Sequence, residues 1–377
     1  MNELPFRGKA CWQISDTTNS SLHVIQSLTV EECIKATIVL LITIAVIVLN
    51  TLMIVVLHSK NYSRYLRDLP KILMTSLSLT DLAVGILVTP ISLISIVKQC
   101  WPWSPTVCAI EALLIAALFH ESTLSLLCIA IDRYICIIHP LRYHTLMTKK
   151  ICYAMVSLSW FMSFSVYAIL IYPNAEYRYD SNGIMSCEPF YEKKLIIILA
   201  TTLFFIPPAF TLVYCYIKIL RVAHRQIKNI QKCPSNAYST IQGYDNIRKF
   251  NVKEKKKTYR ILVTLGSISV GFLIAVTPWT LTELISSVWK VNLPSNVEFV
   301  VTWIAISNSF WNPILYGLLN KSFRSVAYEL ISRFLFKNCL TRIIANSFIF
   351  NNRFHNRNSS PNSGRVDFIL PQTDGSV

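Results

Sequence analysis

Seven long stretches of the chain are almost continuously apolar, and shorter polar segments separate them. A helix needs about 20 mostly apolar residues to cross a bilayer, whereas the strands of a membrane barrel are about half as long and alternate. Because backbone groups find no water partner in hydrocarbon, each stretch predicts a membrane-spanning helix. The predicted spans are Ala36–Leu57, Ile72–Val97, Val107–Ile131, Ile151–Tyr172, Leu195–Leu220, Ile261–Val288 and Phe299–Leu319.

The polar segments between the spans differ in charge from one side to the other. If the N-terminus lies outside, the outer segments hold 8 Lys and Arg against 9 Asp and Glu, and the inner segments hold 26 against 7. Cytoplasmic loops carry such an excess of basic residues, so the charges predict an outer N-terminus and an inner C-terminus. The formal net charge of +16 therefore reflects topology and contact with membrane lipids, and it argues against nucleic acid as a partner.

Five of the 11 cysteines fall on the outer side, where disulfide bonds persist. Cys108 opens the third span and Cys187 lies in the second outer loop, so a bridge between them would pin that loop over the bundle. Five is an odd number, and one outer thiol therefore stays free or pairs elsewhere. A second bridge, between Cys11 and Cys33, is our hypothesis for the N-terminal segment.

Polar, proline and aromatic residues recur in and just after the spans in a characteristic order. They are Asn50, the run Leu79–Ala83, Asp132-Arg133-Tyr134 followed by Pro140-Leu141, Trp160, Pro208 with Tyr216, Phe272 with Pro278, the run Asn312–Tyr316, and Phe323-Arg324. With these motifs the chain resembles the rhodopsin-like G-protein-coupled receptors, in an orphan or amine-like branch, over roughly residues 36–335. The resemblance implies an all-α membrane protein of the plasma membrane, a seven-transmembrane helix bundle with a short amphipathic eighth helix.

The chain outside the spans divides into segments with separate expected roles. Asn19 lies in a glycosylation sequon on the outer side, and Cys339 follows an apolar stripe in 322–335 and is a candidate for palmitoylation. The polar tail offers serines as phosphorylation sites for arrestin-like partners. The expected parts are an extracellular segment 1–35, the bundle 36–319, an amphipathic helix 320–338 that lies on the membrane surface, and a mostly disordered cytoplasmic tail 339–377.

The resemblance also implies how the inner end of the bundle signals. In the family the arginine at the position of Arg133 is held while the receptor is inactive, and is then freed to contact a heterotrimeric G protein. The plainer alternative is an arginine that only reaches the lipid phosphates. The residues expected to take part in coupling and activation are Asp132, Arg133, Tyr134, Leu141, Tyr216, Asn312, Pro313 and Tyr316.

A carboxylate within the second span predicts a buried polar pocket. Asp81 is costly at bilayer depth unless it is paired or hydrated. The family pattern places hydroxyl and amide groups around it, which would suit Na⁺ and water; the alternative is a hydrogen-bond network without an ion. The residues of this network are Asn50, Asp81, Ser122, Asn308, Ser309 and Asn312.

Three positions depart from the family pattern. Thr258 stands where the family often has an acid that pairs with the arginine, and Val276 replaces an aromatic residue in the sixth span. Ile115 stands where amine receptors carry the aspartate that pairs with the ligand cation. Missing restraints on the inactive state predict raised basal activity or an unusual trigger, unless other contacts compensate.

The upper part of the bundle is the expected ligand pocket. It is aromatic and apolar, with two carboxylates near its mouth, so that a cationic or peptide ligand could use the acids and a lipid could use the floor. Alternatively the carboxylates, those of Glu111 and Glu283, both face outer water. Glu121, in mid-span, should find a partner in His120 or in a hydroxyl group. The expected ligand-binding residues are Glu111, Ile115, Phe119, Trp279, Thr280, Glu283, Thr302 and Trp303.

Other classes of function find less support in the sequence. It contains no phosphate loop, nucleophile elbow or dinucleotide fingerprint, so catalysis is not expected. Besides the receptor, which would bind an unknown extracellular ligand, we weigh a non-coupling seven-span decoy or interaction protein. A transporter or channel is the third interpretation.

Overall fold

The computed structural model describes residues 6–11, 28–63, 68–171, 176–180, 183–190, 202, 205–232, 266–286, 288–289 and 293–333. The bundle lies within the unit Met1–Ala327, and the second unit starts at Tyr328. In that second unit the described residues 328–333 are helical, and Arg333 pairs with Glu329 at 2.6 Å. Most of the loop 221–257, the palmitoylation candidate Cys339 and the sequon at Asn19 lie outside the described residues.

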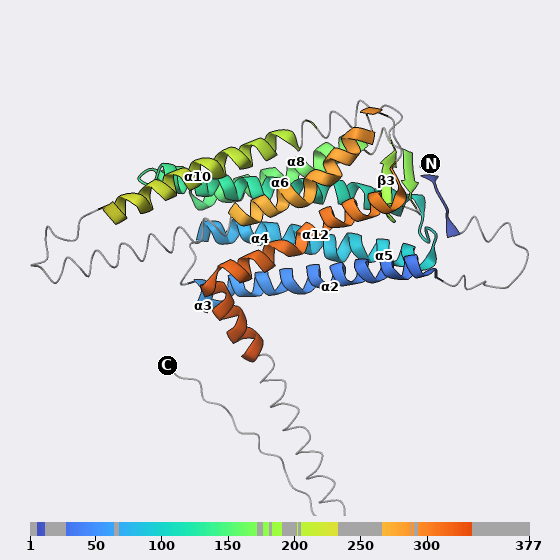
Figure 1. Cartoon of the computed structure of the whole chain (residues 1–377), viewed down its shortest axis with the longest axis horizontal. Helices are drawn as coiled ribbons and strands as arrows, with labels where there is room; N and C mark the ends of the chain where they lie inside the picture. The colour runs from blue at the N-terminus through green and yellow to red at the C-terminus, as the bar shows by residue number, and fades with distance from the viewer. Residues whose placement is uncertain are drawn as a thin grey trace, which may run out of the picture. The chain divides into compact units, whose positions relative to one another are not determined.

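Long helices run side by side through the first unit (Figure 1). The helix of the third span, α6, is central because it contacts α4, α8 and α10. The helix of the first span, α2, contacts α4, α5 and α12. The helices are α2 Val30–His58, α3 Lys60–Ser63, α4 Asp68–Ala83, a π-helical turn η1 Val84–Val88, α5 Thr89–Lys98, α6 Pro105–Ile138, α7 Tyr143–Leu146, α8 Lys149–Ile171, α10 Ile206–Lys232, Gly266–Ser286 and α12 Ser295–Leu319.

The predicted spans correspond to these long helices. Five described helical stretches are long and apolar enough to cross a membrane, and α10 and α12 take the places of the fifth and seventh spans. Large apolar side chains such as Ile44, Phe161 and Ile274 stay exposed on the outside, as expected where hydrocarbon is the solvent. Pro313 lies inside α12, and Pro208 lies in the first turn of α10.

The second span contains a local change of helix type. Pro90 has no N–H to give to the helix ladder, and just before it the N–H of Thr89 bonds to the oxygen of Val84, five residues back. Gly85 lies in this turn, and a Cβ there would approach Val46 of α2 to 2.7 Å. The turn thus brings α2 close to the second span, one helical turn to the outer side of Asp81.

A small sheet covers the outer end of the bundle. β2 (Glu176–Tyr179) and β3 (Cys187–Phe190) form an antiparallel hairpin, and β1 (Phe6–Arg7) pairs with β2 in parallel. Beyond β1 the N-terminal segment pairs with the first outer loop, since Trp101 N–H bonds to Lys9 O at 2.9 Å and Cys11 N–H bonds to Trp101 O at 3.0 Å. Trp101 is fully buried beneath this layer.

Two disulfide bonds join the sheet and the N-terminal segment to the helices. The bridge Cys108–Cys187 is confirmed, and it ties β3 to the first turn of α6. The hypothesis of a bridge between Cys11 and Cys33 is wrong, because Cys11 pairs with Cys100 at the end of the second span. Cys33 is a free, exposed residue within α2, which begins six residues before the predicted span at a capping box formed by Thr29 and Glu32.

Candidate functional site

The inner end of α6 holds a compact group of charged and aromatic side chains. Asp132 is fully buried, and its Oδ2 accepts from Arg133 Nε at 2.8 Å and also from Arg133 Nη2. The other oxygen, Oδ1, accepts from the hydroxyl of Tyr143 in α7 at 2.8 Å. Burial, and next the charge of Asp132, raise the pKa of Tyr143. The arginine is therefore held by its own neighbour, whose second oxygen is held by the inner loop.

Among the described residues, Asp132 is the one predicted signalling residue that is hydrogen-bonded to Arg133. Tyr216 is buried on α10, and Leu141 is 95% exposed in the inner loop. The ring of Tyr134 lies 6.3 Å from that of Tyr214. Thr258 lies outside the described residues, so the inner end of the sixth span is not placed.

Tyr316, at the end of α12, has partners of its own. Its hydroxyl accepts from that of Tyr62 in α3 at 3.4 Å, and its ring meets Phe323 edge-on at 5.3 Å. Asn320 also donates to Tyr62, at 3.2 Å. The sequence analysis missed both Tyr62 and Tyr143, which carry hydroxyl groups on short helices outside the spans.

Asp81, Asn50 and Asn312, three residues of the expected polar network, make hydrogen bonds between helices. Asp81 is fully buried, and its Oδ2 accepts from Asn312 Nδ2 at 2.9 Å. Asn50 Nδ2 donates to the backbone oxygen of Ser309 at 2.9 Å. These contacts join α2, α4 and α12 at the depth where Pro313 interrupts α12.

Several buried oxygen atoms of the residues expected in this network make no hydrogen bond with any described residue. Buried polar groups need partners, so these oxygens call for water or a cation. Oxygen ligands of mixed charge suit a hard cation such as Na⁺. Among the described residues no cluster of three His, Cys, Asp or Glu is suited to a transition metal. The oxygens are Asn50 Oδ1, Asp81 Oδ1, Ser122 Oγ, Asn308 Oδ1 and Asn312 Oδ1.

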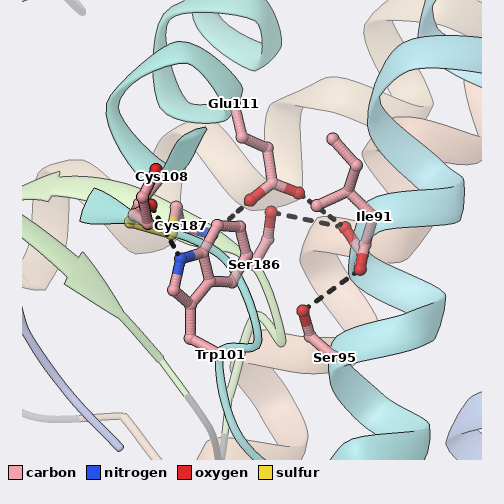
Figure 2. Close-up of a disulfide and its surroundings, with 9 residues drawn as sticks. Ile91, Ser95, Trp101, Cys108, Glu111, Ser186 and Cys187 are labelled. Carbon is pink, nitrogen blue, oxygen red and sulfur yellow. Dashed lines mark hydrogen bonds between the residues drawn. A yellow bond between two sulfur atoms is a disulfide. The ribbon is translucent and has the colours of Figure 1, made fainter. Parts of the chain in front are cut away.

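Glu111 does not lie free at the mouth of the pocket, where it was expected. Its side chain is fully buried, so the alternative that it faces outer water is wrong. Oε1 accepts from the hydroxyl of Ser92 at 3.2 Å, and Oε2 accepts from the backbone N–H of Cys187 at 3.0 Å. Ser92 also bonds to Ser186 at 3.3 Å, and Figure 2 shows Glu111 pointing to Ser186 and Cys187. This carboxylate anchors the second outer loop.

The aromatic floor of the upper pocket comes from α6 and the sixth span. Phe119 lies 5.3 Å from Trp279 and 6.3 Å from Phe272, measured between ring centroids. Val276 is fully buried. The hydroxyl of Thr280 donates a hydrogen bond to the backbone oxygen of Val276 at 3.0 Å. A buried apolar residue thus stands where the family has an aromatic one.

The remaining predicted pocket residues occupy different environments. Ile115 is half-buried on α6, and Thr302 is buried on α12. Trp303 is buried too, and its indole donates to the backbone oxygen of Ile184 at 3.2 Å, so this side chain also braces the outer loop. Glu283 is half-buried, at the outer end of the sixth span.

Carboxylates gather at the outer mouth. Burial raises the pKa of Glu188 in β3 to about 8; the charge of Arg178 opposes this rise, and the charges of Glu283, Asp180 and Glu298 add to it. Arg178 lies 3.3 Å from Glu188. A Cβ on Gly183 would lie 2.5 Å from an oxygen of both Asp180 and Glu298, which places these two oxygens within about 5 Å of each other.

Glu121 confirms the alternative in which hydroxyl groups satisfy a mid-span acid. It is fully buried and accepts from Ser125 at 3.0 Å, from Ser159 at 2.9 Å and from Ser163 at 3.2 Å. The last two serines belong to α8. His120 instead meets Tyr167 edge-on at 5.6 Å.

Known proteins resemble the chain along most of its length. A family model described as 7 transmembrane receptor (rhodopsin family) matches residues 49–316. Trace amine-associated receptor 6 of Pan troglodytes is 28% identical over 295 residues, which are 76% of this chain and 81% of the relative. Trace amine-associated receptor 13c of Danio rerio is 29% identical over 290 residues, or 75% and 82% of the two chains.

Proposed function

The chain belongs to the rhodopsin family of seven-transmembrane receptors, and from this premise we propose that it binds an extracellular ligand and activates a heterotrimeric G protein through Arg133. Proteins of this family are multi-pass receptors of the plasma membrane and not enzymes. The G-protein class, arrestin-like regulators and bound lipids belong to the proposal.

The arrangement of Arg133 supports coupling more than any other observation. Its guanidinium is held by Asp132 alone among the described carboxylates, and its side chain is only 11% exposed. A group held by one neighbouring residue can exchange that partner for another when the inner end of the bundle opens. Signalling would then be a population shift between a state with Arg133 held and a state with Arg133 presented to the G protein.

Arg133→Ala tests this proposal, with Arg142→Ala as the control because Arg142 is exposed in the adjacent loop. G-protein dissociation is followed in cells that express each variant at matched surface level, across the G-protein classes. We expect Arg133→Ala to remove basal and ligand-induced signals, and Arg142→Ala to keep them. Equal signals from wild type and Arg133→Ala would support the decoy alternative, and a solute flux independent of G protein would support a transporter.

For the ligand we propose a cationic amine that is recognised at the outer mouth. The carboxylates near Glu188 favour positive charge, and Ile115 leaves no acid at the deeper position that amine receptors use. The relatives' names refer to trace amines, which is consistent with a cation. The aromatic floor formed by Phe119 and Trp279 would receive the apolar part of the ligand.

A screen of primary and tertiary amines tests the ligand proposal. Any amine that activates the receptor should lose roughly tenfold or more in potency on Glu283→Gln, since one close charge pair is worth that much in a partly buried site. Glu31→Gln is the matched control, because Glu31 is an exposed outer acid that pairs with Lys35. An amine that activates both variants alike would show that the acid at the mouth does not hold the ligand.

We also infer that the pocket around Asp81 holds Na⁺ in the inactive state. The carboxylate would supply charge, and the unpaired oxygens of Asn50, Ser122 and Asn308 would complete the shell. Thermal unfolding of the purified receptor in NaCl or in choline chloride tests this. Na⁺ should raise Tm of the wild type but not that of Asp81→Asn; an equal rise in both variants would exclude a site at Asp81.

A further inference from the structure

Glu121 is a buried acid to which the proposed signalling gives no role. It is fully buried near the middle of α6, and three serine hydroxyl groups lie within hydrogen-bond distance of its carboxyl group. Among the described residues no lysine or arginine forms an ion pair with it. An ionised Glu121 would therefore lack a counter-charge, and such a charge is costly at bilayer depth.

The hydrogens available around the carboxyl group indicate where a proton lies. Ser159 Oγ lies 2.9 Å from Glu121 Oε1 and also 2.9 Å from the backbone oxygen of Val156. With an ionised carboxyl group both of these oxygens are acceptors, yet a serine hydroxyl has a single hydrogen to donate. Protonation of Glu121 reverses the first bond. The carboxyl group then donates to Ser159, Ser159 donates to Val156, and both bonds are complete.

The second carboxyl oxygen fits the same assignment. Oε2 of Glu121 accepts from Ser163 at 3.2 Å, as the carbonyl oxygen of a protonated carboxyl group would. Ser159 and Ser163 are four residues apart on α8, so they lie on one face of that helix. The protonated group thus donates through one oxygen and accepts through the other, and it links α6 to α8 without a buried charge.

A second branch of hydrogen bonds extends from Glu121 to α4. Ser125 donates to Oε1 at 3.0 Å and bonds to Ser76 at 3.4 Å, and Ser76 accepts from the indole of Trp160 at 3.0 Å. The hydroxyl oxygen of a protonated carboxyl group keeps a lone pair that can accept from Ser125. Glu121 is therefore the point at which polar contacts join α4, α6 and α8.

The link connects the two helices that carry the inner loop. α6 ends at Ile138, α8 begins at Lys149, and Tyr143 lies between them on α7. Glu121 precedes Asp132 by about three helical turns along α6. A fixed spacing of α6 and α8 therefore helps to keep the hydroxyl of Tyr143 at 2.8 Å from Asp132.

We propose that Glu121 carries a proton, which it donates to Ser159, and that this neutral link positions the inner loop against Asp132. Glu121 acts on Asp132 through the spacing of α6 and α8 and not by contact. Both parts can be tested without G protein. A looser inner loop would also favour release of Arg133, and only this consequence rests on the proposed coupling.

Infrared spectra of the purified full-length receptor at neutral pH test the proton. The difference between wild type and Glu121→Gln should contain the C=O stretch of a protonated carboxyl group. The difference between wild type and Glu31→Gln should instead contain carboxylate bands, because Glu31 is exposed and pairs with Lys35. Tm of Glu121→Gln should stay within about 2 °C of the wild-type value, since the amide can donate to Ser159 as the carboxyl group does. Carboxylate bands in the Glu121 difference would overturn the proposal.

Hydrogen exchange of the inner loop 139–148, followed by mass spectrometry, tests the positioning. Ser159→Ala removes the acceptor of the proton and should speed exchange several-fold, as should Glu121→Ala. Glu121→Gln should exchange within about twofold of the wild type, because it keeps a donor. Ser165→Ala is the matched control, since Ser165 bonds to the backbone oxygen of Phe161 within α8. The positioning role is excluded if Ser165→Ala acts like Ser159→Ala, or if Glu121→Gln exchanges as fast as Glu121→Ala.

Discussion

The two ends of α6 are held by bonds of different kinds. At the outer end, a disulfide from Cys108 and the backbone N–H bond to Glu111 join the helix to the second outer loop. At the inner end, Asp132 accepts from Arg133 and from Tyr143 through side chains, and these are its side-chain bonds among the described residues. Covalent and backbone bonds permit few alternatives, whereas side-chain pairs can be exchanged for others of similar energy.

This difference indicates which end of the receptor can move. A ligand at the outer mouth meets a surface whose strands and loops are cross-linked in advance, so little of its binding energy is spent on ordering them. In the proposed coupling, the inner end would change state when one ion pair and one phenol hydrogen bond exchange partners. The four predictions below weaken one end or the other, and their effects should separate stability from signalling.

The largest effect is expected from Cys187→Ser. Loss of a native disulfide costs about 2–5 kcal/mol, and here it would also free the N–H that bonds to Glu111. We expect Tm of the purified receptor to fall by several degrees and little protein to reach the cell surface. Cys11→Ser should cost less, because its bridge to Cys100 ties only the N-terminal segment. Equal losses from both variants would mean that the N-terminal segment matters as much as the hairpin.

Glu111→Ala should give the next largest loss. The change leaves the N–H of Cys187 without its buried acceptor, at about 1–3 kcal/mol, whereas the hydroxyl of Ser92 keeps Ser186 as a partner at 3.3 Å. Tm should fall, and ligand-independent signalling should stay near the wild-type level. Glu31→Ala, on an exposed helix face, is the stability control. A normal Tm with lost amine response would instead assign Glu111 to the ligand.

The sequence predicts the inner end better than the outer end, and the reason is physical. Helical periodicity and bilayer thickness determine the depth at which Asp81 and Arg133 lie, whereas the partners expected around them come from the family resemblance. Glu111 was expected to bind a ligand at the pocket mouth, whereas it accepts a hydrogen bond from the backbone of a loop, which no helical pattern predicts. The pairing of Cys11 with Cys100 depends on how the N-terminal strand adds to β2, which no local pattern specifies.

Tyr143→Phe should raise basal signalling while it leaves the outer end unchanged. The change removes the 2.8 Å hydrogen bond to Asp132, and a bond to a charged acceptor contributes about 1.5–3 kcal/mol to the held state. Loss of this bond destabilises the state in which Arg133 is held and shifts the population toward the signalling state, so basal G-protein dissociation should rise several-fold. Tyr328→Phe, at an exposed inner position, should have no effect. Unchanged basal signalling in Tyr143→Phe would show that Asp132 holds Arg133 without help from the loop.

The last effect is a pH dependence of stability that arises at the outer sheet. Burial raises the pKa of Glu188 to about 8 in the folded receptor, above the value of about 4.3 expected in the unfolded chain. The folded state therefore favours the protonated carboxyl, and this contribution to stability is fully present below about pH 4.3 and is lost as the pH rises through about 8.

Tm of the wild type should accordingly decline between pH 6 and pH 9, on top of the slope set by the other groups. Glu188→Gln cannot ionise and should show a shallower decline, whereas Glu31→Gln should follow the wild type. Because Arg178 favours the ionised form, Arg178→Gln should make the decline steeper. Identical slopes for wild type and Glu188→Gln would mean that Arg178 compensates fully. The acidic mouth would then be charged at every physiological pH, which would favour a cationic ligand still more.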